Sequence, residues 1–152
     1  MPLPISQLLG VRLPIVQAPM AGVQDAGLAL AVSAAGALGS LPCAMLGPQA
    51  LRQELERIAA QPGAVVNINF FCHQPPLADP QRDAHWRACL APYYRGLNLD
   101  PAMPLPAATR TPFDAEVADL LAGFRPRVVS FHFGLPAPEL LARIRAWGGR
   151  IL

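Results

Sequence analysis

The sequence has 152 residues, about one domain's worth, and its 53% apolar content is enough for a buried core and excludes a disordered chain. The formal charge is only +2 and the 12 basic residues, all arginines, are scattered along the chain, which excludes nucleic-acid binding and Schiff-base lysine chemistry. The first residues do not resemble a signal peptide and no apolar run could span a membrane, so we expect a cytoplasmic protein without membrane contact.

The rest of the chain is organised around residues 13–22, which predict a strand and a turn that leads into a helix. Residues 15–18 predict a first buried strand, which Pro19 ends because proline has no N–H to donate. Asp25 should cap a helix that runs to Ala35. Residues 20–22 are small or unbranched, so their backbone can lie against a flat ligand, the alternative being an ordinary turn.

The alternation of strand and helix then recurs. The strand at 64–71 is the clearest, with apolar residues on one face and Asn67 and Asn69 on the other. Proline in the first turn marks the helix that follows Gly47. The remaining elements are a strand at 38–41, a helix at 114–121, a strand at 127–133, a helix at 138–147 and the start of a strand at 150–152.

Residues 72–112 interrupt this alternation. They contain a predicted helix at 80–94 and a proline-rich stretch at 98–112. A long excursion after the carboxyl end of a strand is where such folds grow active-site loops. We therefore expect residues 1–152 to form one domain with an insertion at about 72–112.

Two α/β architectures with parallel sheets fit the alternation. A doubly wound fold should carry G-x-G-x-x-G in its first turn, and residues 18–22 have no such spacing. A (β/α)8 barrel places its chemistry after each strand, where Pro19, Asn69 and His132 are predicted to lie. We therefore predict an α/β fold, a partial (β/α)8 TIM barrel with about four βα units and the start of a fifth strand.

Four segments carry a resemblance to a known family. They are Pro-Ile-Val-Gln-Ala-Pro-Met-Ala-Gly at 14–22, Ala-Gly-Ala-Leu-Gly-Ser at 35–40, Val-Asn-Ile-Asn-Phe-Phe at 66–71 and Val-Val-Ser-Phe-His-Phe-Gly-Leu-Pro at 128–136. In this order they resemble the nitronate monooxygenase family, formerly called 2-nitropropane dioxygenases. The resemblance implies an FMN-containing barrel that oxidises alkyl nitronates with O2 to carbonyl compounds and nitrite.

The resemblance also implies which residues form the site. His132 matches a histidine near the flavin, its alternative role being a structural hydrogen bond. Asn69 matches an asparagine that contacts FMN, with Asn67 as the alternative one pleat away. The residues that match the segment along the flavin ring are Ala18, Pro19 and Met20, followed by Ala21 and Gly22.

The resemblance covers essentially the whole chain but only the amino-terminal half of such an enzyme. The family's catalytic histidine, in a Glu-Ala-Gly-Gly-His type segment, and the phosphate loops after strands seven and eight have no counterpart before Leu152. We therefore expect a truncated chain that is inactive alone. The alternatives are a non-catalytic half-barrel or split-enzyme subunit that self-associates through open sheet edges, and an FMN-dependent enoyl reductase with a similar Ala-Pro-Met turn.

A zinc site is the other chemistry considered. Cys72, His73, His85 and Cys89 are suitable ligands, and His85 and Cys89 would lie one helical turn apart. No C-x-x-C spacing supports a site, so we predict loop packing and no bound metal. The three widely spaced cysteines favour free thiols over disulfides.

Overall fold

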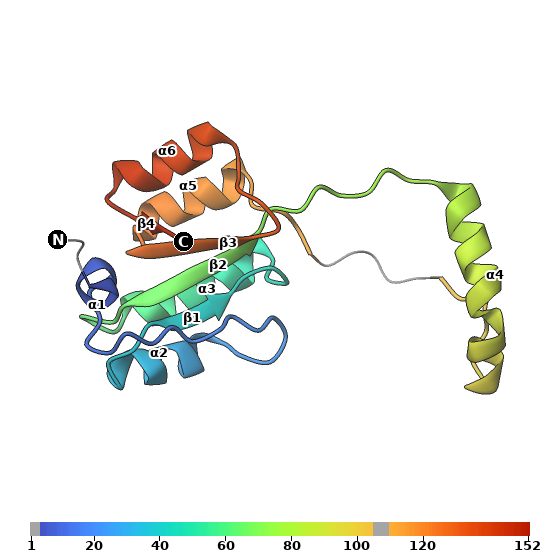
Figure 1. The fold of residues 1–152 in the computed structure, drawn as a ribbon, viewed down its shortest axis with the longest axis horizontal. Helices are drawn as coiled ribbons and strands as arrows, with labels where there is room; N and C mark the ends of the chain where they lie inside the picture. Colours follow the sequence, from blue (N-terminus) through green and yellow to red (C-terminus); the bar gives the residue numbers. More distant parts are fainter. Residues whose placement is uncertain (1–3, 105–109) are drawn as a thin grey trace. The chain divides into compact units, whose positions relative to one another are not determined.

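The computed structural model describes residues 4–104 and 110–152 (Figure 1). Residues 1–3, and residues 105–109 of the predicted proline-rich stretch, lie outside the described residues. The chain divides into two compact units, one from Met1–His73 and Thr109–Leu152 and the other from Gln74–Ala108. The elements are α1 (Ile5–Leu9), α2 (Ala26–Ala34), β1 (Gly39–Pro42), α3 (Pro48–Ala59), β2 (Val66–Phe71), α4 (Pro80–Gly96), α5 (Ala115–Phe124), β3 (Val128–His132), α6 (Pro138–Ala146) and β4 (Arg150–Ile151).

The first unit contains one parallel sheet in the order β1-β2-β3-β4. Neighbours in the sheet are therefore neighbours in the sequence, as in a barrel, whereas a doubly wound sheet reverses its order at a switch point. The register places Ser40 opposite Asn67 and Asn69 opposite Ser130. The predicted parallel sheet with barrel order is confirmed.

One face of this sheet is covered by helices α2, α3, α5 and α6, which share its main core (Figure 1). α2 approaches β1 so closely that a Cβ on Gly39 would collide with the carbonyl oxygen of Ala29. The central buried residues of this core are Ala29, Leu41, Leu51, Leu55, Ile68, Phe70, Leu121, Val129 and Ile144.

The opposite face of the sheet changes from apolar to polar along the strands. At the amino ends, Leu9 of α1 packs on Leu38 and Val128 in a second buried cluster. The sequence patterns did not predict α1, which is only five residues long. Further along the strands, the same face carries the buried polar residues Ser40, Asn67, Asn69 and Ser130. The polar end is the carboxyl edge, where a barrel places its chemistry.

The predicted first strand at 15–18 is reduced to a single bridge between Val16 and Leu38. Leu38 donates its N–H to the carbonyl of Ile15, and Gln17 donates its N–H to the carbonyl of Leu38, both at 2.9 Å. The next ladder bond is missing because the N–H of Ser40 bonds to Gln17 Oε1 at 3.1 Å. The expectation of a regular strand is therefore wrong, although the segment lies beside β1.

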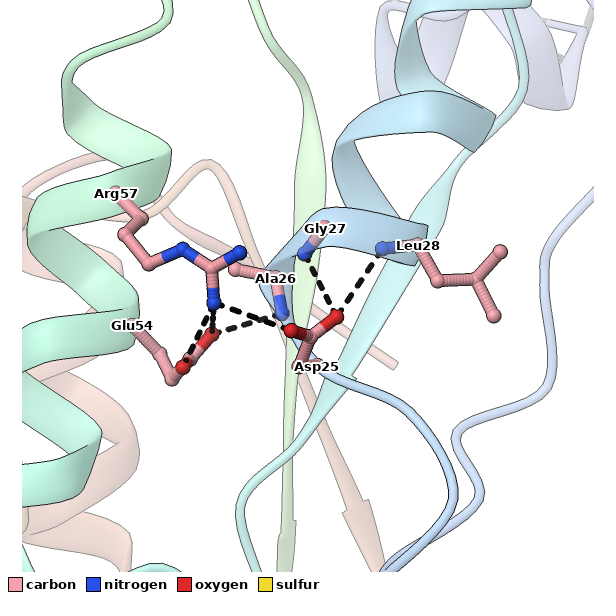
Figure 2. Close-up of polar contacts among 6 residues, drawn as sticks. All are labelled: Asp25, Ala26, Gly27, Leu28, Glu54 and Arg57. Atoms are coloured by element: carbon pink, nitrogen blue, oxygen red, sulfur yellow. Dashed lines mark hydrogen bonds and ion pairs between the residues drawn. The ribbon is translucent and has the colours of Figure 1, made fainter.

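A polar network joins the start of α2 to α3 (Figure 2). As predicted, Asp25 caps α2 and accepts two backbone N–H groups. Glu54 Oε2 accepts the N–H of Ala26 at 2.8 Å, and Arg57 bridges both carboxylates at 3.0 and 3.1 Å. The hydrogen bond from Arg57 is the main cause that holds the pKa of Asp25 below its ordinary value.

The second unit is built around α4, which extends two residues beyond the predicted helix at 80–94. Asp79 caps it by accepting the N–H of Arg82 at 3.0 Å. His85 and Cys89 face each other one turn apart, with Nε2 and Sγ separated by 3.7 Å. None of the helices in the described parts of the chain is both long and apolar enough to cross a membrane.

Candidate active site

The turn at residues 18–22 is fastened to β1 by two glutamine side chains. Gln17 Nε2 donates to Gln24 Oε1 at 2.9 Å, and Gln24 Nε2 donates to the carbonyls of Ala18 and Ser40, both at 3.1 Å. The turn itself projects from the sheet, since Met20 is 53% exposed and Gly22 has a φ of +84°. Sequence reasoning missed Gln24 because this residue lies outside the four matching segments, although the residues it contacts lie within two of them.

The hydroxyl of Ser40 determines how the Asn67 amide is oriented. It donates its one proton to the carbonyl of Gln17 at 2.7 Å, so it must accept from Asn67 Nδ2 at 3.1 Å. Asn67 Oδ1 is consequently left buried without a hydrogen-bond partner among residues 4–104 and 110–152. A buried acceptor without a partner is costly, and a ligand N–H would satisfy it.

Asn69, the other predicted asparagine, bonds to the last residues of β3. Its Nδ2 lies 2.8 Å from Ser130 Oγ and 3.0 Å from His132 Nδ1. Asn69 is 2% exposed, whereas His132 is exposed at the carboxyl end of β3. The structure thus brings the predicted residues Asn69 and His132 into direct contact.

An aromatic pocket lies at the same edge, beside His132. Its cavity of about 460 Å³ is lined by Ala21, Phe71, His73, Arg110 and Phe133. The rings of Phe71 and Phe133 meet edge to face with centroids 4.8 Å apart. Phe133 holds a φ of +64°, a strained backbone of the kind that gathers at functional sites. Sequence reasoning missed Arg110, since no motif surrounds it.

This edge fits the ring of the FMN that the resemblance implies. Residues 18–22 carry no charged or β-branched side chain, which favours the approach of a flat ring to their backbone. Asn67 Oδ1 is an unused buried acceptor for a ring N–H. The predicted ring contacts Ala18, Pro19, Met20 and Ala21 lie on this turn, and Ala21 also lines the aromatic pocket.

None of the described residues that line this pocket is a cysteine. All three cysteines are free thiols, and burial strongly raises the pKa of Cys43, whose Sγ donates to the carbonyl of Leu41 at 3.5 Å. Burial also raises the pKa of Cys72. A buried protonated thiol behaves as a small apolar side chain, so Cys43 has a packing role.

Known proteins resemble nearly the whole of this chain. A family model described as nitronate monooxygenase matches residues 3–149. The nitronate monooxygenase of Paraburkholderia phytofirmans is 40% identical over 95% of this chain and 40% of its own length. That of Pseudomonas aeruginosa is 35% identical over 97% of this chain and 42% of its own length.

Solved structures agree with this match. A nitroalkane oxidase from Streptomyces ansochromogenes superposes with a TM-score of 0.79 and 32% identity, over 98% of this chain and 41% of that one. FabK from Thermotoga maritima, with a TM-score of 0.62 and 19% identity, supports the TIM-barrel fold alone. The chain spans about two fifths of the length of the two nitronate monooxygenases and of the nitroalkane oxidase. With nearly every residue matched and the sheet in barrel order, the chain belongs to the nitronate monooxygenase family.

Proposed function

We propose that this chain forms the flavin-ring side of the active site of an FMN-dependent nitronate monooxygenase. The reaction oxidises an alkyl nitronate with O2 to a carbonyl compound and nitrite. One observation carries the proposal: all four matching segments meet at the carboxyl edge of the sheet. Gln17, Ser40 and Asn67 form one hydrogen-bonded row, and Ala21, Phe71 and Phe133 line one pocket.

The residues of this edge have distinct roles in the proposal. The backbone of Ala18, Pro19, Met20 and Ala21 lies along the flavin ring. The amide oxygen of Asn69, or alternatively that of Asn67, accepts a hydrogen bond from the ring. When bound, FMN supplies the oxidation of the nitronate and the reaction with O2. His132 binds the anionic nitro group of the substrate by a hydrogen bond, in the manner of a preorganised donor.

Self-association belongs to the same proposal. The segment beside β1 exposes Leu13, Ile15 and Val16 by 42–55%, and β4 has one strand neighbour in the described sheet. Unpaired edges with apolar side chains favour pairing with another chain. We therefore propose that the 152 residues by themselves pair with a second copy, and that they bind FMN weakly because no phosphate loop of the barrel is among them.

The free thiols are relevant to the cellular compartment of the protein. Cys43, Cys72 and Cys89 are all unpaired. Free thiols persist in reducing compartments, so a cytoplasmic location is part of the proposal.

The test compares the chain with a fusion that continues it into the carboxyl-terminal part of the P. phytofirmans relative. We expect the fusion to show oxidised-flavin absorbance and nitronate-dependent O2 uptake, and the chain alone to show neither and to exceed monomer mass in solution. A fusion that binds flavin but oxidises NADH with an enoyl substrate would favour the enoyl reductase. A folded fusion without flavin would favour the non-catalytic half-barrel.

A further inference from the structure

The side-chain amide of Asn69 fits the fold in only one of its two orientations. Its Nδ2 lies 3.3 Å from the backbone carbonyl oxygen of Ser130 and 2.8 Å from Ser130 Oγ. A carbonyl oxygen only accepts hydrogen bonds, so the amide atom that faces it must be the NH2 group. The flipped amide would place two oxygens against each other at a residue only 2% exposed.

This orientation determines the tautomer of the neighbouring histidine. His132 Nδ1 lies 3.0 Å from Asn69 Nδ2, which can only donate, so Nδ1 must be unprotonated. In a neutral imidazole the proton then lies on Nε2. We infer that Asn69 is a positioning residue that holds His132 as the Nε2–H tautomer, and that His132 acts as a hydrogen-bond donor and not as a base.

The ring has no nitrogen lone pair left for a substrate proton. Nδ1 is occupied by Asn69, and Nε2 carries the proton. No hydrogen bond to His132 Nε2 occurs within the described parts of the chain, so this N–H is available to a ligand. The rings of Phe71 and His132 form a T-shaped pair, with centroids 6.2 Å apart and planes at 87°, which further restricts the imidazole.

A neutral N–H donor suits an anionic nitro group, because it stabilises negative charge without taking up a proton. A proton acceptor, where the reaction needs one, must then come from another residue than His132. The role of His132 toward the nitro group rests on the proposed function, whereas the assignment of its tautomer does not depend on that function.

The tautomer is measured directly on the ¹⁵N-labelled chain by a long-range ¹H–¹⁵N correlation of the imidazole rings. The spectrum is recorded at a pH of about 8.5, where free histidine is neutral. The chain has three histidines, and the signals lost in His132→Gln assign those of His132. We expect a pyridine-like Nδ1 and a protonated Nε2. A protonated Nδ1 in the unaltered chain overturns the inference.

Asn69→Asp tests the cause, because a carboxylate only accepts hydrogen bonds. In this variant Nδ1 of His132 should become protonated. Asn67→Asp is the matched control, since Asn67 lies on the same strand, is also 2% exposed and contacts Ser40 instead of His132. It should leave the His132 signals unchanged.

If the buried carboxylate of Asn69→Asp prevents folding, Asn69→Leu tests the same effect of residue 69 on the tautomer of His132. It removes the amide donor, so the two nitrogens of His132 should shift toward the averaged values of a mixed tautomer. An unshifted His132 in every folded Asn69 variant shows that Asn69 does not set the tautomer. A missing flavin or missing turnover in the fusion refutes the proposed function alone and leaves these signals as they are.

Discussion

The hydroxyl of Ser40 donates a 2.7 Å hydrogen bond to the backbone carbonyl of Gln17. In a parallel ladder that carbonyl would receive the N–H of Ser40, which bonds to Gln17 Oε1 instead. This exchange ends the pairing with β1 and allows residues 18–22 to leave the sheet. The same hydroxyl orients Asn67, so one serine links the turn to the polar face of the sheet.

Ser40→Ala should therefore destabilise the chain more than the removal of a single hydroxyl group would suggest. It leaves the Gln17 carbonyl and the Asn67 amide without their partner, and a buried polar group without a partner costs about 1–3 kcal/mol. Urea unfolding measures the difference. Ser6→Ala, in α1, is the control, because its hydroxyl makes no hydrogen bond in the described residues. Equal unfolding midpoints for both variants would show that the serine does not anchor the turn.

The packing of α2 on β1 leads to a second prediction. Gly39→Ala places a methyl group against the carbonyl oxygen of Ala29, a backbone atom that moves only with α2. We expect a loss of about 1–3 kcal/mol or more in the free energy of unfolding.

Gly123→Ala is the matched control for that variant. Gly123 lies in α5, and a Cβ there would meet no atom within 4 Å apart from its chain neighbours and the backbone of its own helix. Alanine in a helix is favoured over glycine by about 0.5–1 kcal/mol, so this variant should be more stable than the unaltered chain. A stable Gly39→Ala variant would contradict the close approach of α2 and β1.

Much of the fold follows from local sequence patterns. The alternation of Val66, Ile68 and Phe70 with Asn67 and Asn69 predicts which face of β2 is polar, because side chains alternate along a strand. The cap at the start of α2 and the proline at the start of α3 are likewise local signals, and the structure confirms them.

The contacts of the candidate site depend on residues that are distant in the sequence. Asn69 in β2 contacts Ser130 in the neighbouring strand β3, 61 residues further along the chain, and Arg110 lines the aromatic pocket without any motif around it. The β-branched residues Ile15 and Val16 predict a regular first strand, but the side chain of Gln17 replaces its backbone carbonyl as the acceptor for the N–H of Ser40. Competition between a side chain and the backbone for one hydrogen-bond donor leaves no periodic pattern in the sequence.

The network at the start of α2 predicts a pH effect. The hydrogen bond from Arg57 lowers the pKa of Asp25, so the folded state favours the carboxylate. The resulting stability is present at pH 7 and is lost as the pH falls through the lowered pKa, below about 4. Asp25→Asn should therefore be less stable by at most about 1 kcal/mol at pH 7, because the pair is exposed, and the difference should shrink at lower pH.

Urea unfolding of Asp25→Asn and the unaltered chain from pH 7 to about 3 measures this effect. Arg57→Gln serves as the second arm of a double-mutant cycle. In that background Asp25→Asn should cost less, since the cation that favours the carboxylate is gone (Figure 2). A difference independent of both pH and Arg57 would show that Asp25 acts only as a helix cap.

Under the proposed function, His132→Ala should lower turnover without releasing the flavin. Loss of one preorganised donor costs roughly 100-fold or more in kcat. The fusion protein is assayed for nitronate-dependent O2 uptake and for flavin absorbance per protein. His85→Ala, a change in α4, is the control and should retain full turnover. Full turnover by His132→Ala would leave that histidine a structural role only.

The turn at 18–22 gives the last prediction, which also concerns the fusion protein. Met20→Leu should keep the flavin, because the proposal assigns the ring contact to the backbone of this residue and not to its thioether. The Gly22→Val variant should lose most of its bound flavin. A Cβ on Gly22 would meet Met45 Sδ at 3.7 Å, an ordinary contact, so the Cβ itself is accommodated. The φ of Gly22 is +84°, a backbone conformation that valine adopts only with strain, so the turn should shift away from the ring. Flavin absorbance per protein measures occupancy, and circular dichroism confirms that both variants are folded. Equal occupancy in the two folded variants would contradict the placement of this turn against the flavin.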